Sequence, residues 1–192
     1  SRFRALQQLD NADSSSPLYN GIRLELLGWA DEHDPCDPFV PTGRFEGLPE
    51  LSRGQWTALK IHNASTEALN VCLFDLQPGW SAVQIWPGDG RCSRVLDPDA
   101  YEVIALQIYL PPGYQDGVDI LKAFATTSTT DFRWLELPPI DMPLQGTRSL
   151  NLGDPLEQML TIFRDARPST RHALATKASR GWTSAQVELR IR

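Results

Sequence analysis

Apolar and polar residues alternate with a period of two in several segments, the pattern of β-strands that bury one face. The longest such stretch holds two apolar runs, Tyr101–Leu110 and Val118–Thr126, joined by Pro111–Gly117. Val, Ile, Tyr and Phe suit a pleated, half-buried surface, and Pro and Gly suit a tight reversal of the chain. The pattern therefore predicts that the two runs pair as a long β-hairpin.

Six further segments have strand-like patterns: Gly21–Ala30, Gln55–Asn63, Ala68–Leu76, Trp80–Pro87, Phe132–Leu137 and Trp182–Ile191. In the second of them, Leu59 and Ile61 are predicted to face inward. The short Ala64–Thr66 stretch predicts that Gln55–Asn63 and Ala68–Leu76 form a second hairpin.

Helical patterns occur only near the two ends of the chain. Residues Ser1–Leu9 place Phe3, Leu6 and Leu9 on one side of a short helix. Because so short a helix is marginal alone, we expect it to pack against this domain or against protein outside it. Asp154 and Pro155 begin a second predicted helix, whose apolar stripe is Leu156, Met159, Leu160 and Phe163.

Two segments lack a regular pattern. Residues 31–54 contain four prolines and predict a long surface loop, and Cys92–Asp99 also has the composition of a loop. About eight strands not interleaved with helices predict a mainly β fold, an antiparallel two-sheet sandwich. The length of 192 residues fits a single domain spanning 1–192, with 1–20 as an N-terminal linker and helix.

Cysteine content and the lengths of the apolar runs bear on where the protein is expected to be located. Three cysteines far apart do not suggest a disulfide framework, and no charged-then-apolar leader precedes Pro17. No apolar run approaches the roughly 18 residues of a membrane span. We therefore expect a cytoplasmic protein with no membrane partner.

Charge is unevenly distributed along the chain. A net charge of −6 argues against nucleic acid as a partner, because phosphate binding depends on Lys and Arg. Between Arg164 and Arg192, seven basic residues stand against Asp165 and Glu188, so this segment carries +5 and the remainder −11. The basic segment is either a solvated face or a docking surface for an acidic protein partner.

Cysteine and histidine are the natural candidates for chemistry. A cysteine peptidase needs a thiolate beside an imidazole, but the Gln-Ala-Cys-x-Gly signature of caspases is absent around every cysteine. Cys72 lies in mid-strand, where a small buried hydrophobe is the usual role. His33 and Cys36 supply only part of a zinc site. We predict no catalytic residue, no metal site and no cofactor, and therefore no enzyme activity in this chain.

The six tryptophans raise the possibility of carbohydrate binding by ring stacking. Five of them lie in or beside predicted strands, where aromatic residues more often fill a core: Trp56, Trp80, Trp86, Trp134 and Trp182. A glycan- or ligand-binding sandwich requires at least two tryptophans exposed side by side.

Four segments, in this order, resemble the C-terminal region of bacterial and fungal caspase-like proteins. They are SRFRALQQLDN from Ser1, LNVCLFDLQPGWSAVQIWP from Leu69, LPPGYQDGVDILKAFAT from Leu110 and WTSAQVELRI from Trp182. In that family a β-rich accessory domain follows the caspase-fold peptidase domain. None of the family's catalytic residues is carried over, because they belong to the preceding domain.

The resemblance implies a non-catalytic regulatory or interaction domain that packs against a caspase-like peptidase domain and modulates activation or substrate presentation. Its contact would involve the N-terminal helix, through Phe3, Arg4, Leu6 and Leu9. The alternative is the ligand- or carbohydrate-binding sandwich.

Overall fold

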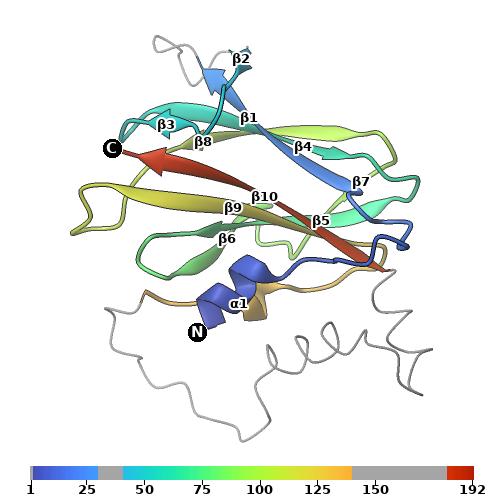
Figure 1. The fold of residues 1–192 in the computed structure, drawn as a ribbon. Coiled ribbons are helices and arrows are strands. Elements are labelled where there is room, and N and C mark those ends of the chain that lie inside the picture. The colour runs from blue at the N-terminus through green and yellow to red at the C-terminus, as the bar shows by residue number, and fades with distance from the viewer. Residues whose placement is uncertain (1, 30–40, 140–180) are drawn as a thin grey trace, which may run out of the picture.

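Two facing β-sheets form the body of the molecule, and a short helix lies against the outer face of one of them (Figure 1). The computed structural model describes residues 2–29, 41–139 and 181–192. Its elements are α1 (Arg2–Gln8), β1 (Ile22–Trp29), β2 (Pro41–Arg44), β3 (Glu50–Leu51), β4 (Trp56–Asn63), β5 (Leu69–Leu76), β6 (Ala82–Trp86), β7 (Arg94–Leu96), β8 (Tyr101–Gln107), β9 (Gly117–Thr126), η1 (Arg133–Leu135) and β10 (Trp182–Ile191).

The four-stranded sheet has the order β2-β1-β4-β8, and the six-stranded sheet has the order β3-β10-β9-β5-β6, with β7 also paired to β5. Neighbouring strands are antiparallel except for the short parallel pair of β10 and β3. The predicted mainly β, two-sheet sandwich with a short N-terminal helix is confirmed. The described residues form ten strands instead of about eight, and the helix predicted after Asp154 lies outside them.

The predicted hairpin between Tyr101–Leu110 and Val118–Thr126 is wrong, because β8 and β9 belong to different sheets. β8 pairs with β4 at the edge of the four-stranded sheet, whereas β9 lies between β10 and β5 in the other sheet. β8 buries at most one face, and nearly all of β9 is buried. The segment 108–116 is long enough to cross between the sheets, so the Pro- and Gly-containing turn does not impose local pairing.

The predicted hairpin between Gln55–Asn63 and Ala68–Leu76 is wrong for a similar reason. β4 pairs with β1 and β8, and β5 pairs with β9, β6 and β7. Asn63, which is fully buried, donates from Nδ2 to the carbonyl oxygens of Glu67 (2.8 Å) and Leu96 (2.9 Å). These hydrogen bonds hold the chain where it passes from one sheet to the other.

Three shorter predictions are corrected as well. The predicted 31–54 loop contains β2 and β3, and the predicted Cys92–Asp99 loop contains β7. These strands are two to four residues long, too short for a clear alternating pattern in the sequence. The predicted strand Phe132–Leu137 is also wrong for most of its length, because Arg133–Leu135 form the 3-10 helix η1 and only Leu137 pairs with a strand, through a bridge to Ala82. The Asp131 carboxylate accepts a hydrogen bond from the Arg133 backbone N–H at 3.0 Å, which favours a turn at this point.

The main core lies between the sheets. Leu59 and Ile61 of β4 are fully buried there, as predicted, and face Leu73, Ala123 and Leu189 of the six-stranded sheet. Strict alternation along β4 explains this burial, since residues two apart lie on the same face.

A second core covers the outer face of the six-stranded sheet. β5 and β9 are buried on both faces, because Phe74 and Phe124 project away from the first core and pack against α1 and η1. The rings of Phe124 and Phe132 stack at 5.3 Å between centroids. The N-terminal helix is therefore an integral layer of the domain.

Candidate functional site

The four predicted interface residues, in and directly after α1, differ in how deeply they are buried. Leu6 and Leu9 are 0% and 4% exposed and belong to the second core of this domain. Phe3 is half-buried at the edge of that core, and Arg4 is exposed. Only Phe3 and Arg4 therefore retain surface that another domain can contact, and a contact of this kind stays a prediction.

Phe3 and Arg4 lie beside an exposed tryptophan, and we call these three residues the Trp80 patch. Trp80 is 39% exposed and stacks on Phe3, with ring centroids 5.9 Å apart and planes at 29°. The guanidinium carbon of Arg4 lies 5.9 Å from the centre of the Trp80 ring, within the range of a cation–π contact. A turn after β5 and the first turn of α1 thus present one aromatic surface.

The backbone of Trp80 adopts an unusual conformation. Its φ angle is +63°, in the left-handed region that bulky side chains rarely occupy. The turn is closed by hydrogen bonds from the Trp80 N–H to the Gln77 carbonyl (3.0 Å) and from the Gln77 N–H to the Ser81 carbonyl (3.0 Å). The Ser81 hydroxyl adds a bond of 2.8 Å to Oε1 of Gln77. The strain is thus held in place by a well-bonded turn, the kind of feature that often marks functional positions.

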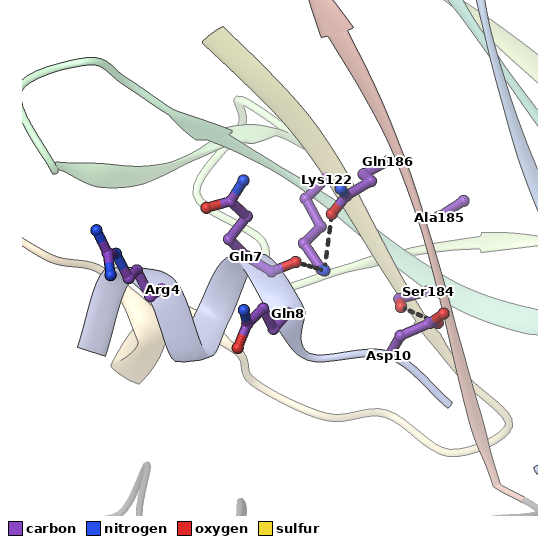
Figure 2. Close-up of a pocket in the computed structure, with 8 residues that line it drawn as sticks. All are labelled: Arg4, Gln7, Gln8, Asp10, Lys122, Ser184, Ala185 and Gln186. Carbon is purple, nitrogen blue, oxygen red and sulfur yellow. Dashed lines mark hydrogen bonds between the residues drawn. The ribbon is translucent and has the colours of Figure 1, made fainter. Parts of the chain in front are cut away.

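A polar cavity of about 540 Å³ adjoins the patch between α1 and the outer face of β9 and β10 (Figure 2). Its lining residues are Arg4, Gln7, Gln8, Asp10, Lys122, Ser184, Ala185 and Gln186. On one side, Ser184 donates to the Asp10 carboxylate at 2.8 Å. Arg4 belongs to both features, so patch and cavity form one continuous region of the surface.

Lys122 is the unusual member of the cavity wall. It is only 2% exposed, and its Nζ donates to the Gln7 carbonyl at 2.7 Å and to Oε1 of Gln186 at 3.0 Å. Burial lowers the pKa of Lys122 to about 8, against the opposing effect of the Asp10 charge. A perturbed lysine at a cavity wall is a candidate for a functional group.

The sequence pattern does not indicate Trp80 or Lys122 as site residues. It places Trp80 in the predicted strand Trp80–Pro87, although Pro78 and Gly79 directly before it signal a turn. Lys122 interrupts an otherwise apolar strand, and a single lysine in such a run indicates a buried, hydrogen-bonded amine.

Two carboxyl groups, Asp75 of β5 and Asp119 of β9, lie on the side of their strands that faces the other sheet, since Leu73 and Leu121 two residues away belong to the core between the sheets. Each has an Oδ1 atom that is buried without a hydrogen-bond partner, while Gln77 donates to Oδ2 of Asp75 at 2.9 Å. Burial and the Asp75 charge raise the pKa of Asp119 to about 8, and burial also raises the pKa of Asp75. The two groups therefore do not ionise together readily at neutral pH.

The described cysteines have different surroundings. Cys72 is fully buried, as predicted, and burial raises the pKa of its thiol to about 12, which keeps it protonated. Cys92 is half-buried, and its sulfur lies 3.9 Å from the Ser93 hydroxyl. His62 pairs with Asp99 at 2.9 Å. His33, Cys36 and His172 lie outside the described residues.

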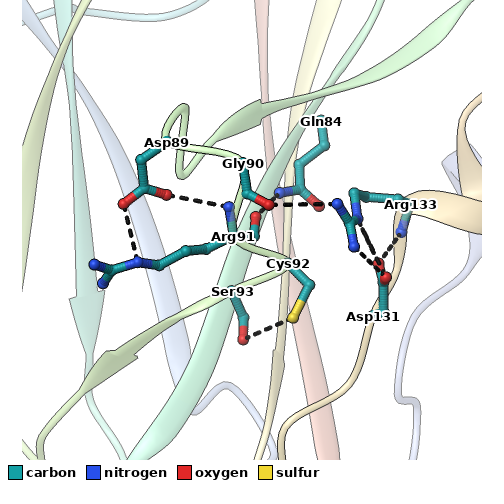
Figure 3. A network of polar contacts seen from close by, with 8 residues as sticks. All are labelled: Gln84, Asp89, Gly90, Arg91, Cys92, Ser93, Asp131 and Arg133. Atoms are coloured by element: carbon teal, nitrogen blue, oxygen red, sulfur yellow. Dashed lines mark hydrogen bonds and ion pairs between the residues drawn. The ribbon is translucent and has the colours of Figure 1, made fainter.

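Cys92 lies beside a polar network that joins the loop after β6 to η1, and its own drawn contact is to Ser93 (Figure 3). The Asp131 carboxylate binds the Arg133 guanidinium, with Nη2 and Oδ2 2.6 Å apart, and this lowers the pKa of Asp131 to about 2. Arg133 also donates to the Gly90 carbonyl at 3.3 Å, and Gln84 donates to the Arg91 carbonyl at 2.9 Å. These contacts are exposed, and the Arg133–Gly90 hydrogen bond connects η1 to the loop after β6.

The tryptophans fill several roles. Trp29, Trp86 and Trp182 are at most 8% exposed, and Trp80 is the most exposed of the six. Trp29 and Trp56 lie side by side on the outer face of the four-stranded sheet, with ring centroids 5.6 Å apart.

In residues 2–29, 41–139 and 181–192, no three His, Cys, Asp or Glu side chains gather as a metal site. The same residues include no helix with the length and apolar character of a membrane-spanning helix. Of the basic segment, they include Arg190 and Arg192, which both pair with Glu50 at 3.3 and 2.8 Å.

Neither a protein-family model nor a curated protein matches the sequence. Among solved structures, the chain is similar to the ASH/PapD-like domain of human CEP192 (PapD-like domain 7), with 10% identity and a TM-score of 0.30. The match covers 83% of this chain and 96% of that chain. A TM-score of 0.30 supports no statement about function, and the relation to caspase-like proteins stays a prediction.

Proposed function

We propose that this chain is a non-catalytic, protein-binding β-sandwich domain that docks onto its partner through the Trp80 patch. The observation that carries the proposal is the exposed Trp80 ring, held outward by a left-handed backbone conformation and stacked on Phe3. The sequence resemblance suggests a caspase-like peptidase domain as the partner, whose activation or substrate presentation the domain would modulate.

The composition of the patch supports protein binding. Tryptophan and arginine are the residues most enriched among those that dominate binding energy at interfaces. Leu6 and Leu9 anchor α1 in the core, so Phe3 and Arg4 are presented by a fixed element. A surface that is already ordered loses less conformational entropy on binding than a flexible one.

Protein binding is favoured over glycan binding by the arrangement of the tryptophans. Trp80 has Phe3 and Arg4 as ring neighbours instead of a second exposed tryptophan. The neighbouring rings of Trp29 and Trp56 do not offer a stacking platform, because Trp29 is 8% exposed and Trp56 is half-buried.

Replacing Trp80 with alanine should weaken binding to the peptidase domain by about tenfold to a hundredfold, because the central ring of the patch is lost. The measurement is the Kd between the full chain and a caspase-like peptidase domain from the same organism, by calorimetry. Tyr109→Ala is the matched control, since Tyr109 is a 60% exposed aromatic residue outside the patch. Equal affinities for all three proteins would refute the proposed docking surface, and no binding by the unmodified chain would refute the proposed partner.

A further inference from the structure

The wall of the cavity beside the Trp80 patch contains a buried lysine, Lys122, without a direct carboxylate contact among the described residues. The Lys122 side chain is almost completely buried, yet both of its hydrogen-bond partners are neutral oxygens, the Gln7 carbonyl and the Gln186 amide. In the described part of the chain, no carboxylate lies within ion-pair distance of its Nζ. Its Nζ also lies 5.7 Å from the centre of the Phe124 ring, and the Asp10 charge favours its protonated form. A direct carboxylate contact, the usual partner of a buried ammonium, is missing among the described residues.

Asp10, the acidic residue of the described cavity lining, already accepts a hydrogen bond from Ser184. Figure 2 shows its carboxylate beside Ser184, while the Nζ of Lys122 lies between Gln7 and Gln186. An ammonium group has three N–H donors, and the two contacts of Lys122 leave one for a further acceptor. Among the described lining residues, Arg4 and Lys122 are basic and Asp10 is acidic.

We propose that this cavity is a carboxylate-binding site that receives an acidic side chain of the protein partner, with Lys122 as its counter-charge. The inference that the carboxylate belongs to a partner protein rests on the proposed function. The volume of about 540 Å³ lies within the range of ligand pockets and accommodates an aspartate or glutamate side chain with part of its backbone. Because Arg4 joins the cavity to the Trp80 patch, one peptide segment can occupy both.

Lys122 suits this role because a carboxylate is ionised at neutral pH and is then a strong acceptor for the remaining N–H of the ammonium group. A charge-assisted hydrogen bond is roughly twice as strong as a neutral one and gains further in a site shielded from water. Gln7 and Gln186 hold the Nζ in position before the ligand arrives, which reduces the entropy lost on binding.

The test compares N-acetylglutamate with its neutral isostere N-acetylglutamine, titrated into the full chain at about pH 6, where Lys122 is protonated. Backbone amide chemical shifts report the binding position. We expect N-acetylglutamate to shift the amides of Gln8, Ser184 and Gln186 and N-acetylglutamine to leave them unchanged. Equal effects of the two probes, or no shift with either, would overturn the carboxylate site.

Two variants separate the role of Lys122 from a loss of fold. Lys122→Met should weaken N-acetylglutamate binding by about tenfold or more while the circular dichroism spectrum is retained. Asp10→Asn keeps an acceptor for Ser184 but removes the competing negative charge, so it should tighten binding by about twofold to tenfold. Unchanged affinity in both variants would contradict the inference, and the Asp10 variant remains informative if the Lys122 variant does not fold.

Trp80→Ala distinguishes this inference from the proposed function. Trp80 lies outside the cavity lining, so this variant should leave N-acetylglutamate binding unchanged while it weakens binding to the protein partner. If the carboxylate binds normally but Trp80→Ala has no effect on partner affinity, the docking surface is wrong and the carboxylate site stands. If partner affinity depends on Trp80 but no carboxylate binds, only the further inference fails.

Discussion

Replacing Leu6 with alanine is expected to lower the free energy of unfolding by about 2–5 kcal/mol. Leu6 is fully buried against the outer face of the six-stranded sheet, in the same cluster as Phe74 and Phe124. Truncation removes buried methyl groups and leaves a cavity under α1 that the surrounding strands cannot fill. Urea unfolding followed by tryptophan fluorescence measures the change.

The matched control for Leu6→Ala is Gln8→Ala, an exposed position on the same helix. This control should change the free energy of unfolding by no more than about 0.5 kcal/mol, because it removes no buried contact. If the two variants were equally stable, α1 would not be part of the core in solution. A large loss in Leu6→Ala also means that interface mutants must be chosen at Phe3 or Arg4.

Replacing Asp119 with asparagine should remove a marked pH dependence of stability. The pKa of Asp119 is raised from 3.8 to about 8 by burial and by the charge of Asp75, so the folded protein holds a proton that the unfolded chain releases. The contribution of this proton is complete below about pH 4 and is lost as the pH rises to about 8. Over this range the unmodified chain should lose about 2–5 kcal/mol of stability relative to Asp119→Asn.

The measurement is the free energy of unfolding at several pH values between about 5 and 8 for both proteins. Asp116→Asn is the control, since Asp116 is an exposed carboxyl in the loop before β9. Lys122 titrates in the opposite sense: its lowered pKa makes stability rise between about pH 8 and 10.5, which is why the series stops at 8. Parallel pH profiles for the unmodified chain and Asp119→Asn would show that Asp119 is ionised in the folded protein.

Strand location could be predicted because alternation is a local property. The strands β1, β4, β5 and β10 fall within a few residues of their predicted limits, and Leu59 and Ile61 face the core as expected. Pairing could not be predicted in the same way. A connection with turn residues is compatible with a hairpin and equally with a crossing between sheets, and only the packing of both sheets decides between them.

The candidate site was predictable in part. The helical period placed Phe3, Leu6 and Leu9 on one side, which indicated that α1 packs against something. Which residues of that helix remain accessible depends on what covers it. The six-stranded sheet buries Leu6 and Leu9, and the turn after β5 brings Trp80 against Phe3.

A mainly β sandwich with a short amphipathic N-terminal helix could be predicted from the sequence alone, because periods of two and of 3.6 residues are set by neighbouring positions. Three outcomes came from long-range packing: β8 and β9 belong to separate sheets, β9 is covered on both faces, and Lys122 meets Gln7, 115 residues away in the sequence. Those outcomes depend on contacts between residues distant in sequence, whose free energy appears only when both partners are in place.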